Sequence, residues 1–210
     1  MAERGSRFAS PRRAVVAGVL ILTLPAAACA DDDGSGRQPT EPAATGPTGT
    51  LTTNGPSPIG LLYENADLHF TVEYPESWVA DKRPQQTGVV VLFFATESAG
   101  DGFAENVNVV GPEELQLDFT SKQYGKAGWQ NFRPLLRDVE VMEQRDLTIE
   151  GVPAFSMEYE GDFQGQRLHW LQVFLVDGRR GFVLTYTGRG VEFDTYRPEA
   201  EAIVGSFRLT

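Results

Sequence analysis

The sequence predicts an exported α+β protein, in which a mainly antiparallel β-sheet flanked by helices follows a signal peptide and a flexible linker. A basic and then apolar leader ends at Cys29, the only cysteine of the chain. An acidic segment rich in Gly, Pro and Thr follows it. From about position 59 onward, short alternating apolar segments separated by turn residues dominate, which is typical of consecutive hairpins. We therefore divide the chain into residues 1–28, 29–58 and 59–210.

The first 28 residues have the order of a secretory signal peptide. Four arginines precede an apolar stretch, residues 14–24, and small residues close it. A membrane-spanning helix needs roughly 20 apolar residues, whereas this stretch reaches about 15 even when extended to position 28, and Pro25 interrupts it. We expect a cleaved signal peptide rather than a permanent transmembrane anchor.

Cys29 is the residue on which the predicted membrane attachment depends. A lone cysteine in an exported chain has no internal disulfide partner. Three alanines precede it, and the junction resembles the lipobox of bacterial lipoproteins, although lipoboxes prefer Leu before these small residues. The alanines also suit an ordinary signal peptidase, so plain secretion is the alternative. Because the cysteine stands where a bacterial lipoprotein carries its lipid, we expect palmitate and related acyl chains on Cys29. Each buried methylene adds about 0.8 kcal/mol, so two or three chains would anchor the protein stably.

The linker and the net charge restrict the partners. Residues 30–58 hold one large apolar side chain, Leu51, so they cannot offset their ordering entropy and form a stalk with an r.m.s. span of ~30 Å. The net charge is −11, and −14 remains once the +3 of residues 1–28 is removed. This excess of negative charge argues against nucleic acid and anionic lipid headgroups as partners. The expected partners are the membrane, through the lipid on Cys29, and an envelope protein or a small ligand.

The first half of the domain mixes strands with one helix. Residues 68–74 alternate so that the even positions share one buried face and His69 points away from it. Residues 89–94 and 106–110 predict two further strands. The pattern changes between 118 and 132, where Asp118 or Thr120 can cap a helix that ends before Pro134.

Hairpins dominate the second half. Turn residues at 150–151, 161–165 and 177–181 separate strand segments at 139–149, 152–160, 167–176 and 182–187. A final helix is expected with Asp194 as its N-cap and Pro198 in its first turn, followed by a short terminal strand.

These elements resemble a known family. The matching segments are residues 74–78 (YPESW), 151–154 (GVPA), 183–187 (VLTYT), Phe193, Tyr196, Ile203 and residues 206–208 (SFR). In this order they resemble PsbP-like domains, and specifically the LpqN-type lipoproteins of actinobacteria. The resemblance implies an α+β sandwich with helices packed on an antiparallel sheet, and it carries no metal-handling residue onto this chain.

The residues that can perform chemistry are few. His69 and His169 lie far apart and no second cysteine exists, which excludes a zinc site of four N/S ligands; a mixed site of His and carboxylates is the alternative. No nucleophile elbow, phosphate-binding loop or dinucleotide motif occurs. Glu158 and Glu160 share a strand face, where we expect solvated side chains rather than a catalytic pair. We therefore expect no catalytic residue, no metal and no cofactor.

Aromatic side chains are the remaining candidates for binding. Trp129 lies on a helix interrupted by glycines, and His169 and Trp170 are neighbours in a strand, so one of the two points outward. Packing between helix and sheet is the alternative for all three. The sequence thus predicts a non-enzymatic interaction or assembly module held at the extracytoplasmic face of the membrane. The alternative is a lipoprotein that binds a small or lipidic ligand between sheet and helices, and an enzyme ranks third.

Overall fold

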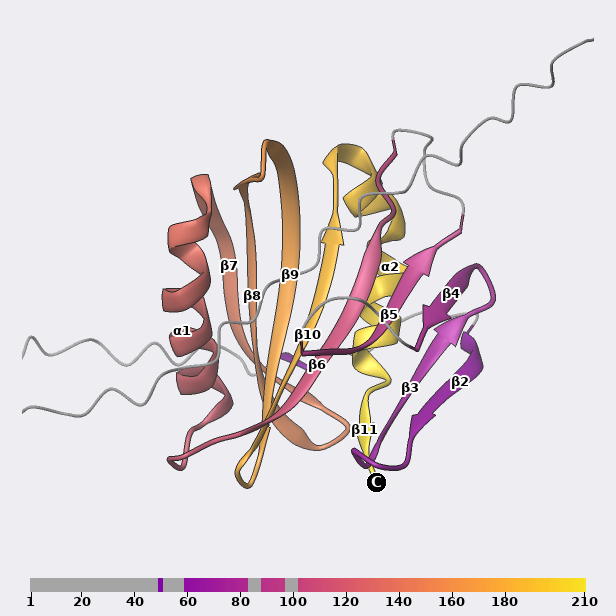
Figure 1. Cartoon of the computed structure of the whole chain (residues 1–210), viewed down its shortest axis with the longest axis vertical. Helices are drawn as coiled ribbons and strands as arrows, with labels where there is room; N and C mark the ends of the chain where they lie inside the picture. Colours follow the sequence, from indigo (N-terminus) through magenta and orange to yellow (C-terminus); the bar gives the residue numbers. More distant parts are fainter. Residues whose placement is uncertain (1–48, 51–58, 83–87, 97–101) are drawn as a thin grey trace, which may run out of the picture.

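A computed structural model describes residues 49–50, 59–82, 88–96 and 102–210 of the protein. The predicted signal peptide, Cys29 and most of the predicted linker lie outside the described residues. The described part consists of two β-sheets and two α-helices stacked in layers (Figure 1). The predicted α+β class with a mainly antiparallel sheet is confirmed.

Among the described residues, the larger sheet has eight strands and the smaller sheet has three. Neighbouring strands are antiparallel except for the first pair of the larger sheet, in which two linker residues run parallel to the next strand. The larger sheet contains, in spatial order, β1 (Gly49–Thr50), β7 (Arg137–Ile149), β8 (Val152–Phe163), β9 (Gln166–Asp177), β10 (Arg180–Gly188), β6 (Asn106–Glu114), β5 (Val89–Ala95) and β4 (Trp78–Asp81). The smaller sheet contains β11 (Arg208–Leu209), β3 (Phe70–Pro75) and β2 (Ile59–Asn65).

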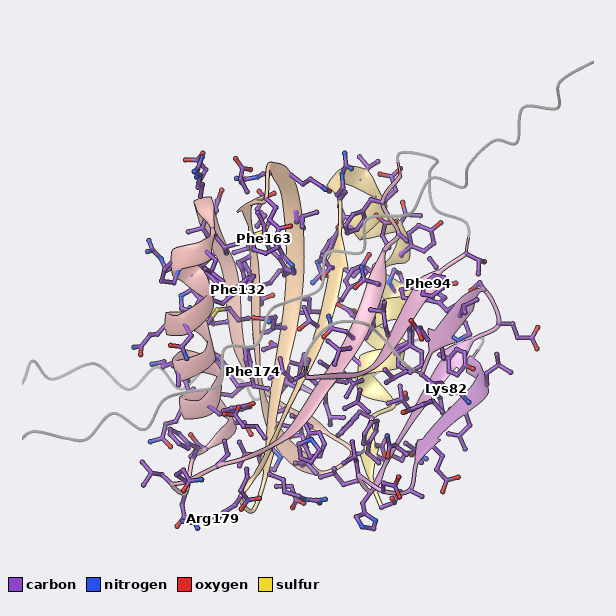
Figure 2. The ribbon with its side chains drawn as sticks, in the orientation of Figure 1. Lys82, Phe94, Phe132, Phe163, Phe174 and Arg179 are labelled. Atoms are coloured by element: carbon purple, nitrogen blue, oxygen red, sulfur yellow. The ribbon has the colours of Figure 1, made fainter. Side chains whose placement is uncertain are left out.

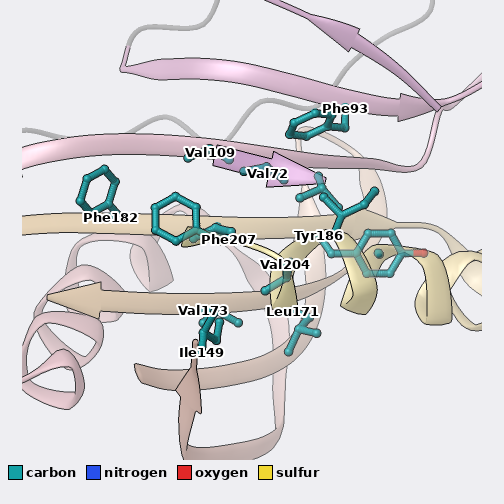
Figure 3. Close-up of a cluster of buried hydrophobic side chains, with 14 of the residues drawn as sticks. Val72, Phe93, Val109, Ile149, Leu171, Val173, Phe182, Tyr186, Val204 and Phe207 are labelled. Atoms are coloured by element: carbon teal, nitrogen blue, oxygen red, sulfur yellow. The ribbon is translucent and has the colours of Figure 1, made fainter. Parts of the chain in front are cut away.

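One face of the larger sheet packs against the smaller sheet and α2 (Gly190–Gly205). The core between them draws alternate residues from β3, β5, β6, β9 and β10, as the period of a strand requires. Figure 3 shows part of this core, including Val72, Phe93, Val109, Val173 and Phe207. The face predicted for residues 68–74 is confirmed, because Phe70 and Val72 are fully buried in this core.

The opposite face packs against α1 (Ser121–Phe132), which lies over β8 and β9 and continues into the short 3₁₀ helix η1 (Arg133–Leu135). Phe132 and Phe174 line this second core (Figure 2). A Cβ atom at Gly125 would lie 2.6 Å from Phe155 and 2.9 Å from Phe174. The glycine is needed for this close approach, although it lowers the helix propensity.

The two helix starts have different causes. Thr120 is the N-cap of α1, and its capping box with Gln123 confirms one of the two predicted caps. The predicted N-cap Asp194 is wrong, because α2 already begins at Gly190 and Pro198 lies inside it. Phe193 fixes this earlier start: its ring stacks on Tyr186, whose hydroxyl donates to the Phe193 carbonyl at 2.8 Å. His69 was also expected in a strand, but it precedes β3 in a turn with φ of 55°.

Candidate functional site

Trp129 and Trp170 meet around Tyr159 beneath α1. The Trp170 and Tyr159 rings stack with centroids 5.2 Å apart, and Trp129 lies against the same tyrosine at 4.6 Å. Trp170 is 1 % exposed, whereas Trp129 is partly exposed. The structure therefore places Trp170 in the core under α1, and Trp129 closes that core from the helix.

His169 lies on the opposite face of the sheet, apart from the two tryptophans. Its ring stacks on Phe193 of α2 with centroids 3.5 Å apart. Its Nε2 lies 3.0 Å from a carboxylate oxygen of Glu158, on the neighbouring strand β8. The expectation that Glu158 is solvated is wrong, because α2 covers it and leaves it 6 % exposed. The three candidate binding residues thus do not form one site.

Arg197 of α2 neutralises the buried Glu158. Its guanidinium donates to both carboxylate oxygens, at 3.0 and 2.7 Å, and its Nε donates to Glu201 at 2.8 Å. Burial opposes ionisation of Glu158, but hydrogen bonds from His169 and Arg197 outweigh it and lower its pKa to about 2. This ion cluster holds α2 against β8 and β9.

A hollow of about 310 Å³ lies beside His169, at the start of α2. Its lining contains both acidic and basic residues, namely Glu160, Arg167, Arg189 and Glu192. Of the described residues that line it, none is a Ser, Thr or Cys, so the lining offers His169 and Glu158 no nucleophile to activate. The geometry favours a structural role for this ion cluster.

Polar side chains that were not predicted form a second feature, on the α1 face of the sheet. Asn108, Thr185 and Gln172 stand opposite one another across β6, β10 and β9. Asn106 and Thr187 form the next row, which continues through Trp170 to Tyr159. We call Asn106, Asn108, Gln172, Thr185 and Thr187 the polar patch; all five are buried, with exposures of 0 to 4 %.

Much of the polar patch lacks hydrogen-bond partners within the described part of the chain. The exceptions are Gln172, which donates to the Thr185 hydroxyl at 3.2 Å, and the Asn106 amide nitrogen, which donates to the Ala104 carbonyl at 2.9 Å. Without a partner are the Asn106 Oδ1, both polar atoms of the Asn108 side chain, the Thr187 Oγ1 and the adjoining Tyr159 hydroxyl. Each such buried group costs about 1–3 kcal/mol when unpaired.

Apolar side chains border the polar patch on both sides. Leu92 and Phe94 of β5 extend its two rows in one direction, and Met157 and Tyr159 of β8 extend them in the other. Phe94 is visible beside β5 in Figure 2. Burial raises the pKa of Tyr159, so its hydroxyl stays protonated. The arrangement can recognise a molecule through hydrogen bonds, but it offers no group that titrates near neutral pH.

The described residues contain no group of three or more His, Cys, Asp or Glu side chains that can hold a metal ion. In the same ranges, no helix has the length and apolar character needed to cross a membrane.

The fold is similar to two solved structures. Cyanobacterial PsbP (CyanoP) from Synechocystis sp. PCC 6803 is 18% identical, with a TM-score of 0.53, over 79% of this chain and 100% of that chain. LpqN of Mycobacterium tuberculosis, described as involved in cell envelope biogenesis, is 16% identical, with a TM-score of 0.50, over 79% of this chain and 99% of that one. At these identities the likeness shows the fold alone, and the fold is PsbP-like. No protein-family model and no curated protein matches the chain.

Proposed function

We propose that this chain is an exported envelope protein, held at the extracytoplasmic face of the cell membrane by lipid on Cys29, whose PsbP-like domain binds a ligand without catalysing a reaction. The leader and the lone cysteine at its end support the export and the anchor. The likeness of the fold to LpqN, which is involved in cell envelope biogenesis, is in keeping with an envelope location.

The polar patch is the observation that supports binding. Buried polar groups in folded domains are normally paired, and groups left unpaired point to a bound water, a bound ion or a functional role. A small set of convergent polar groups among apolar side chains is also the usual lining of a ligand site. Of the two binding roles expected from the sequence, this feature favours a small ligand, held on the face of the sheet that also carries α1.

An assembly role has less support among the described residues. Their exposed large apolar side chains are scattered over β2, β4, β7, η1, α2 and a loop. Scattered apolar side chains are normal for a protein surface, whereas a partner site needs a contiguous patch.

We propose the absence of catalysis from the side chains present in the polar patch and in the ion cluster around Glu158. The rows of the polar patch contain neutral side chains from β5 through β8, without a His or carboxylate to act as a base. His169 and Glu158 are engaged with Phe193 and Arg197.

Two measurements test this function. Cys29→Ala should move the protein from the membrane to the soluble fraction and abolish palmitate labelling; membrane retention of this variant would contradict the anchor. Native mass spectrometry of the protein released from its own membrane should show a bound small molecule at a fixed stoichiometry. A domain that is free of ligand in every preparation would contradict ligand binding and revive the assembly role.

A further inference from the structure

We infer that the polar patch is the binding site for an uncharged molecule that both donates and accepts hydrogen bonds, through amide or hydroxyl groups, next to an apolar body. This inference rests on the proposed ligand-binding function and names the site and the chemical class of the ligand.

The unpartnered atoms are close enough to contact one small molecule. Residues opposite each other on antiparallel strands have Cβ atoms about 4.5–5.5 Å apart, and residues two apart along a strand are separated by about 7 Å. Asn108 and Asn106 are two apart on β6, and Thr187 is directly opposite Asn106 on β10. A molecule of a few heavy atoms can therefore reach all three side chains at once.

The unpartnered atoms define what the ligand must offer. Asn108 presents a free amide nitrogen, which donates, and a free carbonyl oxygen, which accepts. The free Asn106 oxygen accepts only, and the Thr187 hydroxyl can do either. A ligand with acceptors alone, or with donors alone, would leave part of the patch unpaired.

The described strand residues around the polar patch offer no charge that could pair with a charged ligand. From Leu92 and Phe94 at one end to Met157 and Tyr159 at the other, both rows consist of neutral side chains. Burying an ion without a countercharge costs far more than burying a neutral polar group. The apolar ends of the rows instead provide contacts for the nonpolar part of a neutral ligand.

Acetamide and acetate are matched probes for this inference, because they have nearly the same shape and differ in charge and in donors. The reporters are the side-chain amide resonances of Asn106 and Asn108 in ¹⁵N NMR spectra of the mature chain, residues 29–210, in detergent micelles. Acetamide should shift them saturably, and acetate at the same concentration should not. An equal response to acetate would overturn the chemical class, and the lack of a saturable response to acetamide would overturn the site.

Three variants separate binding from folding. Asn108→Leu and Thr187→Val remove unpartnered polar atoms, so both should stay folded with an unchanged or higher thermal midpoint. The Asn106 amide is present in both variants, and each substitution should weaken its response to acetamide by at least about fivefold. The control Thr71→Val makes the same change on β3 of the smaller sheet and should leave the response unchanged. The inference would be overturned if the control alone lost its response, or if all three variants kept theirs.

The same variants separate this inference from the proposed function. If a molecule copurifies with the wild-type protein but is retained by Asn108→Leu and Thr187→Val, the domain binds a ligand elsewhere and the site is wrong. If the copurified molecule is ionic, the class is wrong and the binding function stands.

Discussion

Replacing Arg197 by Met tests how the buried charge of Glu158 is tolerated. Methionine keeps much of the side-chain volume but removes both hydrogen bonds to the Glu158 carboxylate, of 3.0 and 2.7 Å. Within the described part of the chain, His169 would then be the one side chain left to hydrogen-bond this carboxylate, which belongs to a residue that is 6 % exposed. We therefore expect a large loss in the free energy of unfolding at neutral pH.

The pKa of Glu158 gives the magnitude. Folding lowers it from 4.5 to about 2, and each pKa unit is equivalent to about 1.4 kcal/mol, so ionised Glu158 contributes about 3 kcal/mol. Because the folded pKa is the lower one, this contribution is complete above about pH 5 and is lost as the pH falls toward 2. Breaking one side of a buried ion pair typically costs about 3–5 kcal/mol, which agrees with this value.

Urea unfolding at pH values from 7 down to 3 measures the effect. The wild-type protein should lose stability below pH 5 with a slope from Glu158 of up to about 1.4 kcal/mol per pH unit. Arg197→Met should lose about 3 kcal/mol at pH 7 and show a shallower slope, since its Glu158 has a higher pKa in the folded state. The control Arg208→Met removes an arginine whose side chain is 52% exposed, and it should change stability by less than about 0.5 kcal/mol. A loss below about 1 kcal/mol with an unchanged slope would refute the reasoning.

Three further outcomes are expected. Gly125→Ala should destabilise the protein by about 1–3 kcal/mol in urea unfolding, because its Cβ would lie 2.6 Å from Phe155; an unchanged stability would mean that α1 does not pack so closely. Thr120→Ala should cost about 1 kcal/mol by removing the cap of α1, whereas Ala at exposed Asp118 should cost far less. Trp170→Glu should prevent folding as judged by circular dichroism, while Trp129→Glu should leave a folded but weakened domain, because Trp170 is fully buried and Trp129 is partly exposed.

The sequence predicted the hairpins of the second half well because period-2 apolar patterns and turn residues are local signals. The cap at Thr120 was found for the same reason. The start of α2 was missed because it depends on the packing of Phe193 against Tyr186 and His169, which no local pattern encodes. β4 was missed because four residues are too few to show a period.

The polar patch and the ion cluster were missed for a shared physical reason. Alternation of polar and apolar residues, as in residues 106–110, predicts one solvated strand face. In this fold both faces of the central strands are covered, so Asn106, Asn108 and Glu158 are buried instead. Two Asn residues spaced by two in an apolar strand were the available signal, but the sequence does not reveal which helix or strand covers them.

A crystal structure of the mature protein purified from its own membrane would test the account most directly. We predict electron density for an uncharged molecule that accepts a hydrogen bond from the Asn108 amide nitrogen and contacts Thr187 and Asn106. Density for ordered water alone at the polar patch, or side chains of the protein itself paired with these atoms, would contradict the account.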